Sequence, residues 1–185
     1  MDNGINGYRR FLEGDSDGIV EIIKDYKDGL IFFLNGIVQN LYTAEELTEE
    51  TFVKLVVKKP RFSEKCSFKT WLYTIGRNIA LDYIRANSRI SDVPIDEYHH
   101  MSNDEDDLEK SYIREEQKII VHKALAKLKS EYRQVLYLIY CEGFDNKQAA
   151  TVMKKSKRQI ENLIYQAKRA LKSELLKENF NYEEL

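Results

Sequence analysis

The chain has 185 residues, of which 43% are apolar and 32% charged, and its formal net charge is −2. This length is enough for one ordinary domain or two small ones. The composition excludes collagen-like and low-complexity chains, and no uncharged apolar run is long enough to cross a membrane. The first residues lack a secretory-signal pattern, and Cys66 and Cys141 alone cannot form a disulfide framework. We therefore expect a soluble, cytoplasmic protein.

The charges are arranged in alternating blocks. Residues 1–53 carry −7, residues 54–89 carry +7, residues 90–116 carry −8 and residues 117–177 carry +9. Basic blocks are typical of proteins that contact polyanions, because each neutralised phosphate releases counterions. The same arrangement also fits two solvated helical faces. Charge alone therefore leaves both interpretations open.

The apolar periodicity is helical almost throughout the chain, which predicts an all-α fold. Asp15 and Ser16 are N-cap candidates for a helix over 19–26. A second apolar segment follows over 30–41. These segments begin the predicted N-terminal domain.

Two further helices are predicted in this domain. Thr43 stands three residues before Glu46, which is the spacing of a capping box, and opens a helix that ends near Lys58 because Pro60 follows. Ser67 opens a long helix. Its expected inward stripe consists of Phe68, Trp71, Leu72, Ile75 and Ile79.

Residues 89–111 interrupt the helical pattern. They contain Pro94, clusters of acidic residues and few large aliphatic side chains. Such a segment cannot bury enough apolar surface to offset the entropy lost on folding. We expect two small helical domains, at 1–88 and 112–185, joined by a flexible acidic linker.

The C-terminal domain has the proportions of a helix-turn-helix. A helical pattern over 132–140 is followed by a turn at Gly143, a short helix near 146–153 and a long helix over about 156–177. One side of the last helix is apolar, and the opposite side carries groups that read base edges and hold phosphates in a major groove. A helical hairpin whose polar face is merely solvated is the alternative.

Three stretches of the chain resemble one protein family. They are AEELTEETFVKL at 44–55, RFSEKCSFKTWLYTIGRNIALDYIR at 61–85, and the stretch from ALAKLKSEYRQV to YQAKRAL at 124–171. In this order and spacing they resemble bacterial RNA polymerase sigma factors of the sigma-70 family, extracytoplasmic-function (ECF) class. The most specific part is the string W-L-Y-x-I-x-R-N-x-x-x-D-x-x-R. The resemblance implies promoter-specific initiation of transcription.

The resemblance implies that the first stretch docks on core RNA polymerase. The partner would be the clamp helices of the beta-prime subunit, with the beta subunit also part of the core. Acidic and apolar side chains share one flank of this helix, which suits a basic partner helix with an apolar anchor. The residues expected to bind the core are Glu45, Glu46, Glu49, Phe52 and Val56.

The second stretch would melt and capture the upstream edge of the promoter −10 element. Melting requires a pocket for an unstacked base and cations for the displaced strand. The residues expected to contact this DNA are Arg61, Phe62, Ser63, Lys65, Lys69, Tyr73, Arg77, Asn78 and Arg85. Trp71 is expected to be a core residue, and Asp82 is expected to pair locally with Asn78 or Arg85.

The third stretch would read the promoter −35 element as duplex DNA. The residues expected to do so are Ser156, Lys157, Arg158, Gln159, Glu161, Asn162, Tyr165, Lys168 and Arg169. The resemblance also implies an anti-sigma factor as a partner that covers the polymerase- and DNA-binding faces.

The sequence lacks a Gly-rich phosphate loop, a His-Glu-x-x-His motif and a Cys-x-x-Cys motif. We therefore expect no enzymatic activity, no cofactor and no metal site. His99 and His100 are interpreted as a solvated pair, and Cys66 as a plain thiol. A stand-alone helix-turn-helix repressor that binds paired half-sites as a dimer is the main alternative. A helical protein-interaction module is a third.

Overall fold

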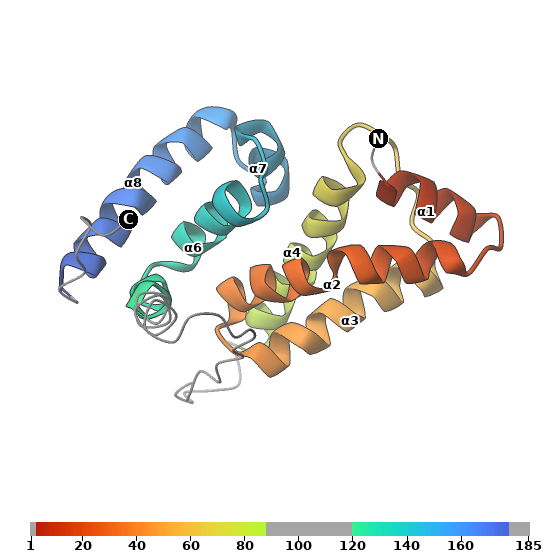
Figure 1. Ribbon diagram of the computed structural model, residues 1–185, viewed down its shortest axis with the longest axis horizontal. Helices are drawn as coiled ribbons and strands as arrows, with labels where there is room; N and C mark the ends of the chain where they lie inside the picture. Colours follow the sequence, from red (N-terminus) through yellow and green to blue (C-terminus); the bar gives the residue numbers. More distant parts are fainter. Residues whose placement is uncertain (1–2, 88–119, 178–185) are drawn as a thin grey trace, which may run out of the picture.

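The computed structural model describes residues 3–87 and 120–177, which form two groups of helices (Figure 1). The N-terminal group contains α1 (Asn3–Leu12), α2 (Asp17–Val38), α3 (Leu41–Lys58) and α4 (Phe68–Asn87). The C-terminal group starts with a helix that ends at residue 126. It continues with α6 (Ser130–Leu136), η1 (Tyr137–Cys141), α7 (Asn146–Met153) and α8 (Lys157–Lys177). The described ranges contain no strand, and the predicted all-α class is confirmed.

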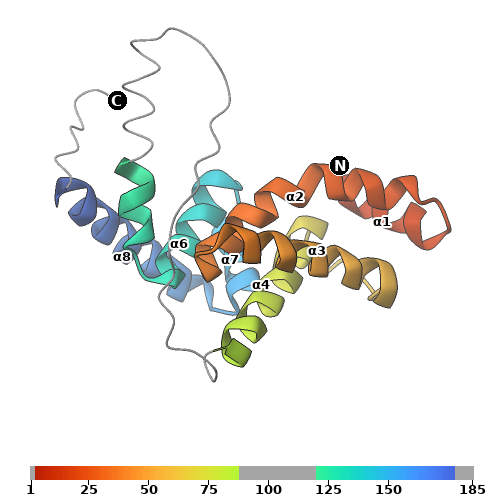
Figure 2. The ribbon, with the colours of Figure 1, turned by 90° about the horizontal axis from the view of Figure 1, so that it is seen from below.

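The central element of the N-terminal group is α2, against which α1, α3 and α4 all pack (Figures 1 and 2). Leu30, Phe33 and Leu34 of α2 are fully buried. The two apolar segments predicted over 19–26 and 30–41 are therefore mostly one continuous helix. Burying a large apolar side chain of this kind stabilises the fold by about 1.5–3 kcal/mol.

Two helix starts differ from the prediction. The sequence pattern does not predict α1, since Asn3, Gly4 and Gly7 have poor helix propensity. The N-cap of α3 is Asn40 and not Thr43, because the Asn40 side chain accepts a hydrogen bond from the Thr43 backbone N at 2.9 Å. The helix consequently begins at Leu41. The predicted linker at 89–111, with His99 and His100, lies outside the described residues.

A cluster of aromatic rings fixes the loop at 59–67 to α1 and α4. The ring of Phe62 lies 5.1 Å from the ring of Trp71 and 5.9 Å from that of Phe68. Tyr8 of α1 lies 5.4 Å from Trp71, and its hydroxyl donates to the backbone O of Pro60 at 2.8 Å. Trp71 packs against the core, as the sequence predicts.

We expect Tyr8 to make stability depend on alkaline pH. Burial raises the pKa of Tyr8 to about 12 from an ordinary value of 10.0. Because the folded-state pKa is the higher one, this contribution is complete below pH 10 and is lost as the pH rises through about 12. Tyr8→Phe is expected to lower the free energy of unfolding by about 1 kcal/mol at neutral pH and to flatten its decline above pH 10. Urea unfolding at a series of pH values measures both effects, and equal pH slopes in the two proteins would contradict the expectation.

The chain between α6 and α7 contains a wider helical turn. In η1 the backbone N of Glu142 donates to the O of Tyr137 at 3.1 Å, five residues back rather than four. Such a turn accommodates one residue more than an α-helix would. It sets the direction in which Glu142 and Phe144 leave the helix.

The two helical groups pack against each other. In Figures 1 and 2, α6 and α7 lie beside α2 and α4, and contacts join α2 to α6 and α4 to α7. The ring of Phe33 lies 5.3 Å from that of Tyr73 and 6.4 Å from that of Tyr137, and Tyr73 lies 5.3 Å from Phe144. One apolar core therefore runs through both groups.

Candidate nucleic-acid and partner interfaces

The helix-turn-helix consists of α7, a tight turn and α8. Asp145 caps α7, since its carboxylate accepts from the backbone N of Lys147 and of Gln148, and Gln148 Oε1 in turn accepts from the Asp145 backbone N at 2.9 Å. Lys154 ends α7 in the left-handed conformation, with φ of 53°. These local interactions fix the angle at which α8 leaves the turn.

The N-terminus of α8 has a second reciprocal cap. The backbone N of Ser156 donates to Gln159 Oε1 at 2.7 Å, and the backbone N of Gln159 donates to Ser156 Oγ at 3.2 Å. Ser156 and Gln159 were expected to contact DNA. Both are exposed, but their side chains hold the first turn of α8 together. Their first role in this structure is to present that turn in a fixed conformation.

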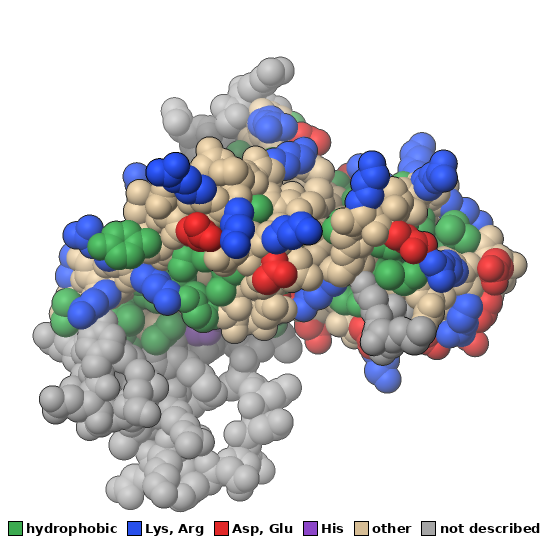
Figure 3. All heavy atoms as spheres, turned by 90° about the horizontal axis from the view of Figure 1, so that it is seen from above, with side chains coloured by type: hydrophobic (Ala, Val, Ile, Leu, Met, Phe, Trp, Pro, Cys, Tyr) green, Lys and Arg blue, Asp and Glu red, His purple; other side chains and the backbone are tan. Residues whose placement is uncertain are grey.

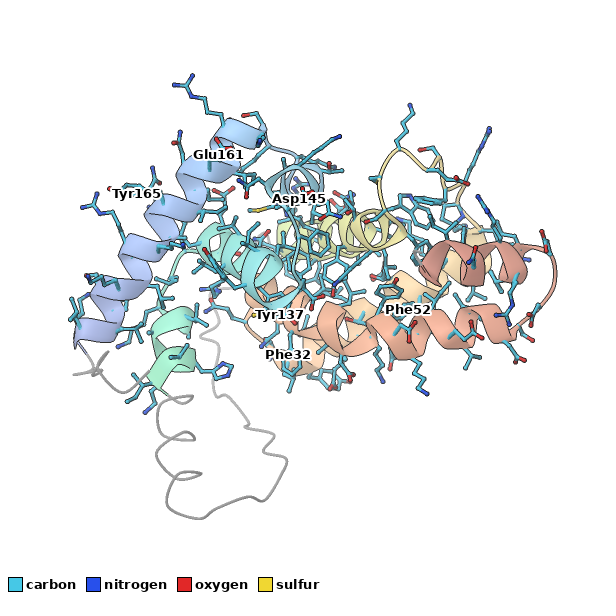
Figure 4. All side chains as sticks on the ribbon, turned by 45° about the horizontal axis from the view of Figure 1, so that its top comes forward. Phe32, Phe52, Tyr137, Asp145, Glu161 and Tyr165 are labelled. Atoms are coloured by element: carbon cyan, nitrogen blue, oxygen red, sulfur yellow. The ribbon has the colours of Figure 1, made fainter. Side chains whose placement is uncertain are left out.

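The face of α8 that points away from α6 carries the remaining residues expected to read DNA. Figure 4 shows Glu161 and Tyr165 on this outer side, and Tyr165 is 63% exposed. Ile160 and Ala167 on the opposite side are fully buried. The helical period in the sequence therefore predicts the two faces correctly. The other exposed members of the outer face are Lys157, Arg158, Asn162, Lys168 and Arg169.

The outer face of α8 is predominantly cationic. The guanidinium of Arg169 lies 5.8 Å from the Tyr165 ring, and Lys168 Nζ lies 5.1 Å from the Tyr140 ring. Glu161 Oε1 is 3.9 Å from Lys157 Nζ. In Figure 3, Lys and Arg side chains outnumber Asp and Glu side chains over the left part of the molecule, where α7 and α8 lie. This face suits a phosphate backbone with base edges between the strands.

The exposed side of α3 is acidic and apolar, but it does not include Phe52. Phe52 is only 6% exposed and packs in the core, so the expectation of an exposed apolar anchor at this position is not met. It belongs to the buried side of the helix with Thr51 and Leu55. Figure 4 shows Phe52 next to α2 rather than on the outside. The residues expected beside it are exposed: Glu45, Glu46, Glu49 and Val56.

Two exposed residues of α3 were missed by the sequence analysis. Tyr42 is 69% exposed and Val53 is 57% exposed. The carboxylate of Glu46 accepts a hydrogen bond from the Tyr42 hydroxyl and thereby raises the pKa of Tyr42. Tyr42, Glu46, Glu49 and Val53 follow a spacing of four, three and four residues, which places them on one stripe. The same helical wheel could have found them with Asn40 as its starting cap.

The loop at 59–67 presents part of the group expected to contact the −10 element. Arg61, Ser63 and Lys65 are exposed, whereas Phe62 is half-buried in the aromatic cluster. Glu64 Oε1 lies 2.5 Å from Arg9 Nη2, which ties the loop to α1. The exposed cations of this loop are therefore held on a fixed base.

The residues of this group that lie on α4 are mostly covered. Tyr73 is fully buried and Arg77 is 6% exposed, and burial lowers the pKa of Arg77. Lys69 Nζ lies 2.7 Å from Glu142 Oε2. Farther along, Asn78 is half-buried. At the end of α4, Arg85 is exposed and pairs with Asp82 at 2.8 Å, as the sequence predicts.

Within residues 3–87 and 120–177 there is no group of three side chains suited to hold a metal ion. No helix in these ranges is long and apolar enough to span a bilayer. Cys141 is exposed, and Cys66 is half-buried in the loop at 59–67. The chemistry of the described surface is that of cationic and aromatic contacts.

Comparisons with known proteins agree with this arrangement. Residues 22–90 match the Sigma-70 region 2 family and residues 118–171 match the Sigma-70 region 4 family. The chain is 25% identical over 170 residues to the RNA polymerase sigma-H factor of Pseudomonas aeruginosa, covering 88% of each chain. It is 24% identical over 155 residues to the ECF RNA polymerase sigma factor SigM of Bacillus subtilis, covering 84% of this chain and 93% of the relative.

Solved structures share the fold. The sigma factor RpoE of Bartonella quintana, solved with the anti-sigma factor NepR, aligns with a TM-score of 0.69 and 24% identity, over 85% of this chain and 95% of that one. CnrH, solved with the cytosolic domain of CnrY, aligns with a TM-score of 0.66 and 18% identity, over 93% and 96%.

The fold and the cationic outer face of α8 define a helical transcription factor with a helix-turn-helix at its C-terminal end. A stand-alone repressor is not favoured, because both matched regions are regions of sigma factors. The chain belongs to the sigma-70 family of RNA polymerase sigma factors, in the ECF class. It is a transcription initiation factor.

Proposed function

We propose that this sigma factor uses three separate surfaces in initiation. The exposed stripe of α3 docks on the clamp helices of core RNA polymerase. The loop at 59–67 and α4 hold the −10 strand, and the outer face of α8 reads the −35 duplex. The observation that carries the proposal is the division of α8 into a buried apolar side and an exposed side with Arg158, Asn162 and Arg169.

The α3 stripe supports docking on a basic helix. Glu46 and Glu49 offer negative charge, and Tyr42 and Val53 offer exposed apolar surface beside it. Complementary charge speeds and orients association, while a desolvated apolar contact contributes most of the affinity. Catalysis is then the task of the polymerase, and the protein acts in the cytoplasm, where that enzyme works.

An anti-sigma factor is the proposed regulatory partner. The related sigma factor RpoE of Bartonella quintana was solved with the anti-sigma factor NepR, which supports such a partner for this chain. An anti-sigma factor that covers the α3 stripe would compete directly with the polymerase.

Co-purification with bacterial core RNA polymerase tests the docking surface. Glu49→Lys with Val53→Asp is expected to lower core binding about a hundredfold, because it reverses one charge and places another in a contact that must lose water. The matched control is Glu13→Lys, a charge reversal in the turn between α1 and α2. Binding that resists the double change but is lost in Glu13→Lys would move the docking surface away from α3.

A further inference from the structure

Three side chains proposed to contact the −10 strand lie on one stripe of α4. Lys69, Tyr73 and Arg77 are each four residues apart, so they lie one above the other on the same side of the helix. Lys69 Nζ lies 2.7 Å from Glu142 Oε2 and also donates to the Glu142 backbone O at 2.9 Å. Tyr73 is fully buried, with its ring 5.3 Å from that of Phe144. The C-terminal group therefore covers this stripe.

The third residue of the stripe is also covered from the C-terminal side. Arg77 Nε donates to Gln134 Oε1 at 2.8 Å, and both side chains are buried. We call these six residues the interdomain seam: Lys69, Tyr73, Arg77, Gln134, Glu142 and Phe144.

Contacts on α2 extend the seam. Arg133 Nε donates to the backbone O of Gly36 at 2.9 Å, and Gln39 Nε2 donates to the backbone O of Ala126 at 3.0 Å. These pairs join residues that are 97 and 87 positions apart in the chain. The C-terminal group is thus held on both α2 and α4.

We propose that the interdomain seam is an autoinhibitory contact. While it is closed, Lys69, Tyr73 and Arg77 cannot reach DNA, and the C-terminal group must leave α4 before the −10 strand is held. This inference rests on the proposed role of these three residues in contacting the −10 strand. It assigns a competing occupant to their surface, namely the C-terminal group of the same chain.

The C-terminal side of the seam offers the same chemistry as a single DNA strand. Glu142 presents a negative charge to Lys69, as a phosphate would. Phe144 presents an aromatic ring to Tyr73, as a base would. The C-terminal group and a melted strand therefore satisfy the same side chains and cannot both occupy them.

The seam can open without unfolding either group. Its central ion pair is partly exposed, with Lys69 and Glu142 side chains 32% and 12% accessible. Interfaces between domains of one chain resemble transient protein–protein interfaces. The apparent affinity of the stripe for DNA is its intrinsic affinity reduced by the fraction of molecules that are open. Opening is then the step that a binding partner controls.

An engineered disulfide tests the closed state. A Cβ atom on Gly36 would lie 3.9 Å from the Cβ of Arg133, inside the range of about 3.5–4.5 Å that disulfides need. We would combine Gly36→Cys and Arg133→Cys with Cys66→Ala and Cys141→Ala in the full chain. The probe is a short fluorescent single-stranded DNA of randomised sequence. The oxidised protein is expected to bind it at least about tenfold more weakly than the same protein after reduction.

A second variant opens the seam without a disulfide. Glu142→Ala removes the partner of Lys69 and is expected to strengthen binding of the same probe about tenfold. The matched control is Glu174→Ala, which removes the same charge from an ion pair within α8, where Glu174 Oε1 lies 2.6 Å from Lys177 Nζ and the Glu174 side chain is 19% exposed. The control is expected to bind the probe as the wild type does.

The results separate this inference from the proposed function. Failure of the disulfide to form, or equal probe binding by the oxidised and reduced protein, overturns the autoinhibitory seam. So does a gain in Glu174→Ala equal to that in Glu142→Ala. Core polymerase binding by the wild type is measured in parallel. If polymerase binds while the disulfide has no effect, the seam is refuted and the docking proposal stands; if the disulfide acts as expected without polymerase binding, the reverse holds.

Discussion

Replacing Arg158 and Arg169 together by alanine is expected to lower promoter-directed transcription about a hundredfold. Both residues lie on the exposed outer face of α8, and Arg169 is positioned over the Tyr165 ring. A base-edge contact of this type contributes about 1–3 kcal/mol, and 1.4 kcal/mol per residue already gives this factor. The measurement is transcription by the reconstituted holoenzyme on a promoter that the wild type selects from a randomised duplex pool.

Salt dependence distinguishes a phosphate contact from a base contact in the same variant. Each phosphate contact that is lost is expected to reduce the slope of log affinity against log salt by about one unit. The control is Lys24→Ala with Lys27→Ala, which removes the same charge from exposed positions of α2. An equal loss of transcription in this control would mean that net charge, and not the outer face of α8, carries the effect.

Gly18→Ala is expected to lower the free energy of unfolding by about 2–3 kcal/mol. A Cβ atom at this position of α2 would clash with the backbone O of Gly7 in α1, and a Cβ on Gly7 would lie 2.9 Å from the backbone O of Gly18. Backbone atoms cannot move aside as the end of a side chain can, so α1 must shift away from α2. Urea unfolding measures the change.

Another glycine of α2 provides the matched control. A Cβ on Gly36 meets only the Cβ of Arg133 at 3.9 Å, which is an ordinary contact. Gly36→Ala is therefore expected to raise stability by about 0.5–1 kcal/mol, since alanine loses less backbone entropy in a helix. A similar destabilisation in both variants would show that close packing of α1 on α2 is not the cause.

Helical periodicity predicts the faces of α8 correctly because they depend only on spacing within one helix. Ile160 and Ala167 are buried and Tyr165 is exposed, as the wheel places them. The same method misplaces Phe52, which lies at the border of the inward arc, where the neighbouring helix decides burial. Poor local propensity likewise hides α1, which is stabilised by packing of Tyr8 on α4.

The covering of Lys69, Tyr73 and Arg77 could not be predicted from the sequence. Their partners lie 57 to 73 positions away for the hydrogen-bonded pairs, beyond the reach of any local pattern. The residue types in the stripe suit DNA and an acidic, aromatic protein surface equally well. The sequence therefore indicates the chemistry of this surface but not which occupant it has.

The wider turn of η1 has a consequence for comparing relatives by alignment. Because it holds one residue more than an α-helix, deleting a single residue between 137 and 141 would restore regular winding and rotate everything that follows by about 100°. Glu142 would then leave the direction of Lys69 although neither residue had changed. A one-residue gap at this point of an alignment is therefore expected to separate sigma factors that possess this ion pair from those that do not.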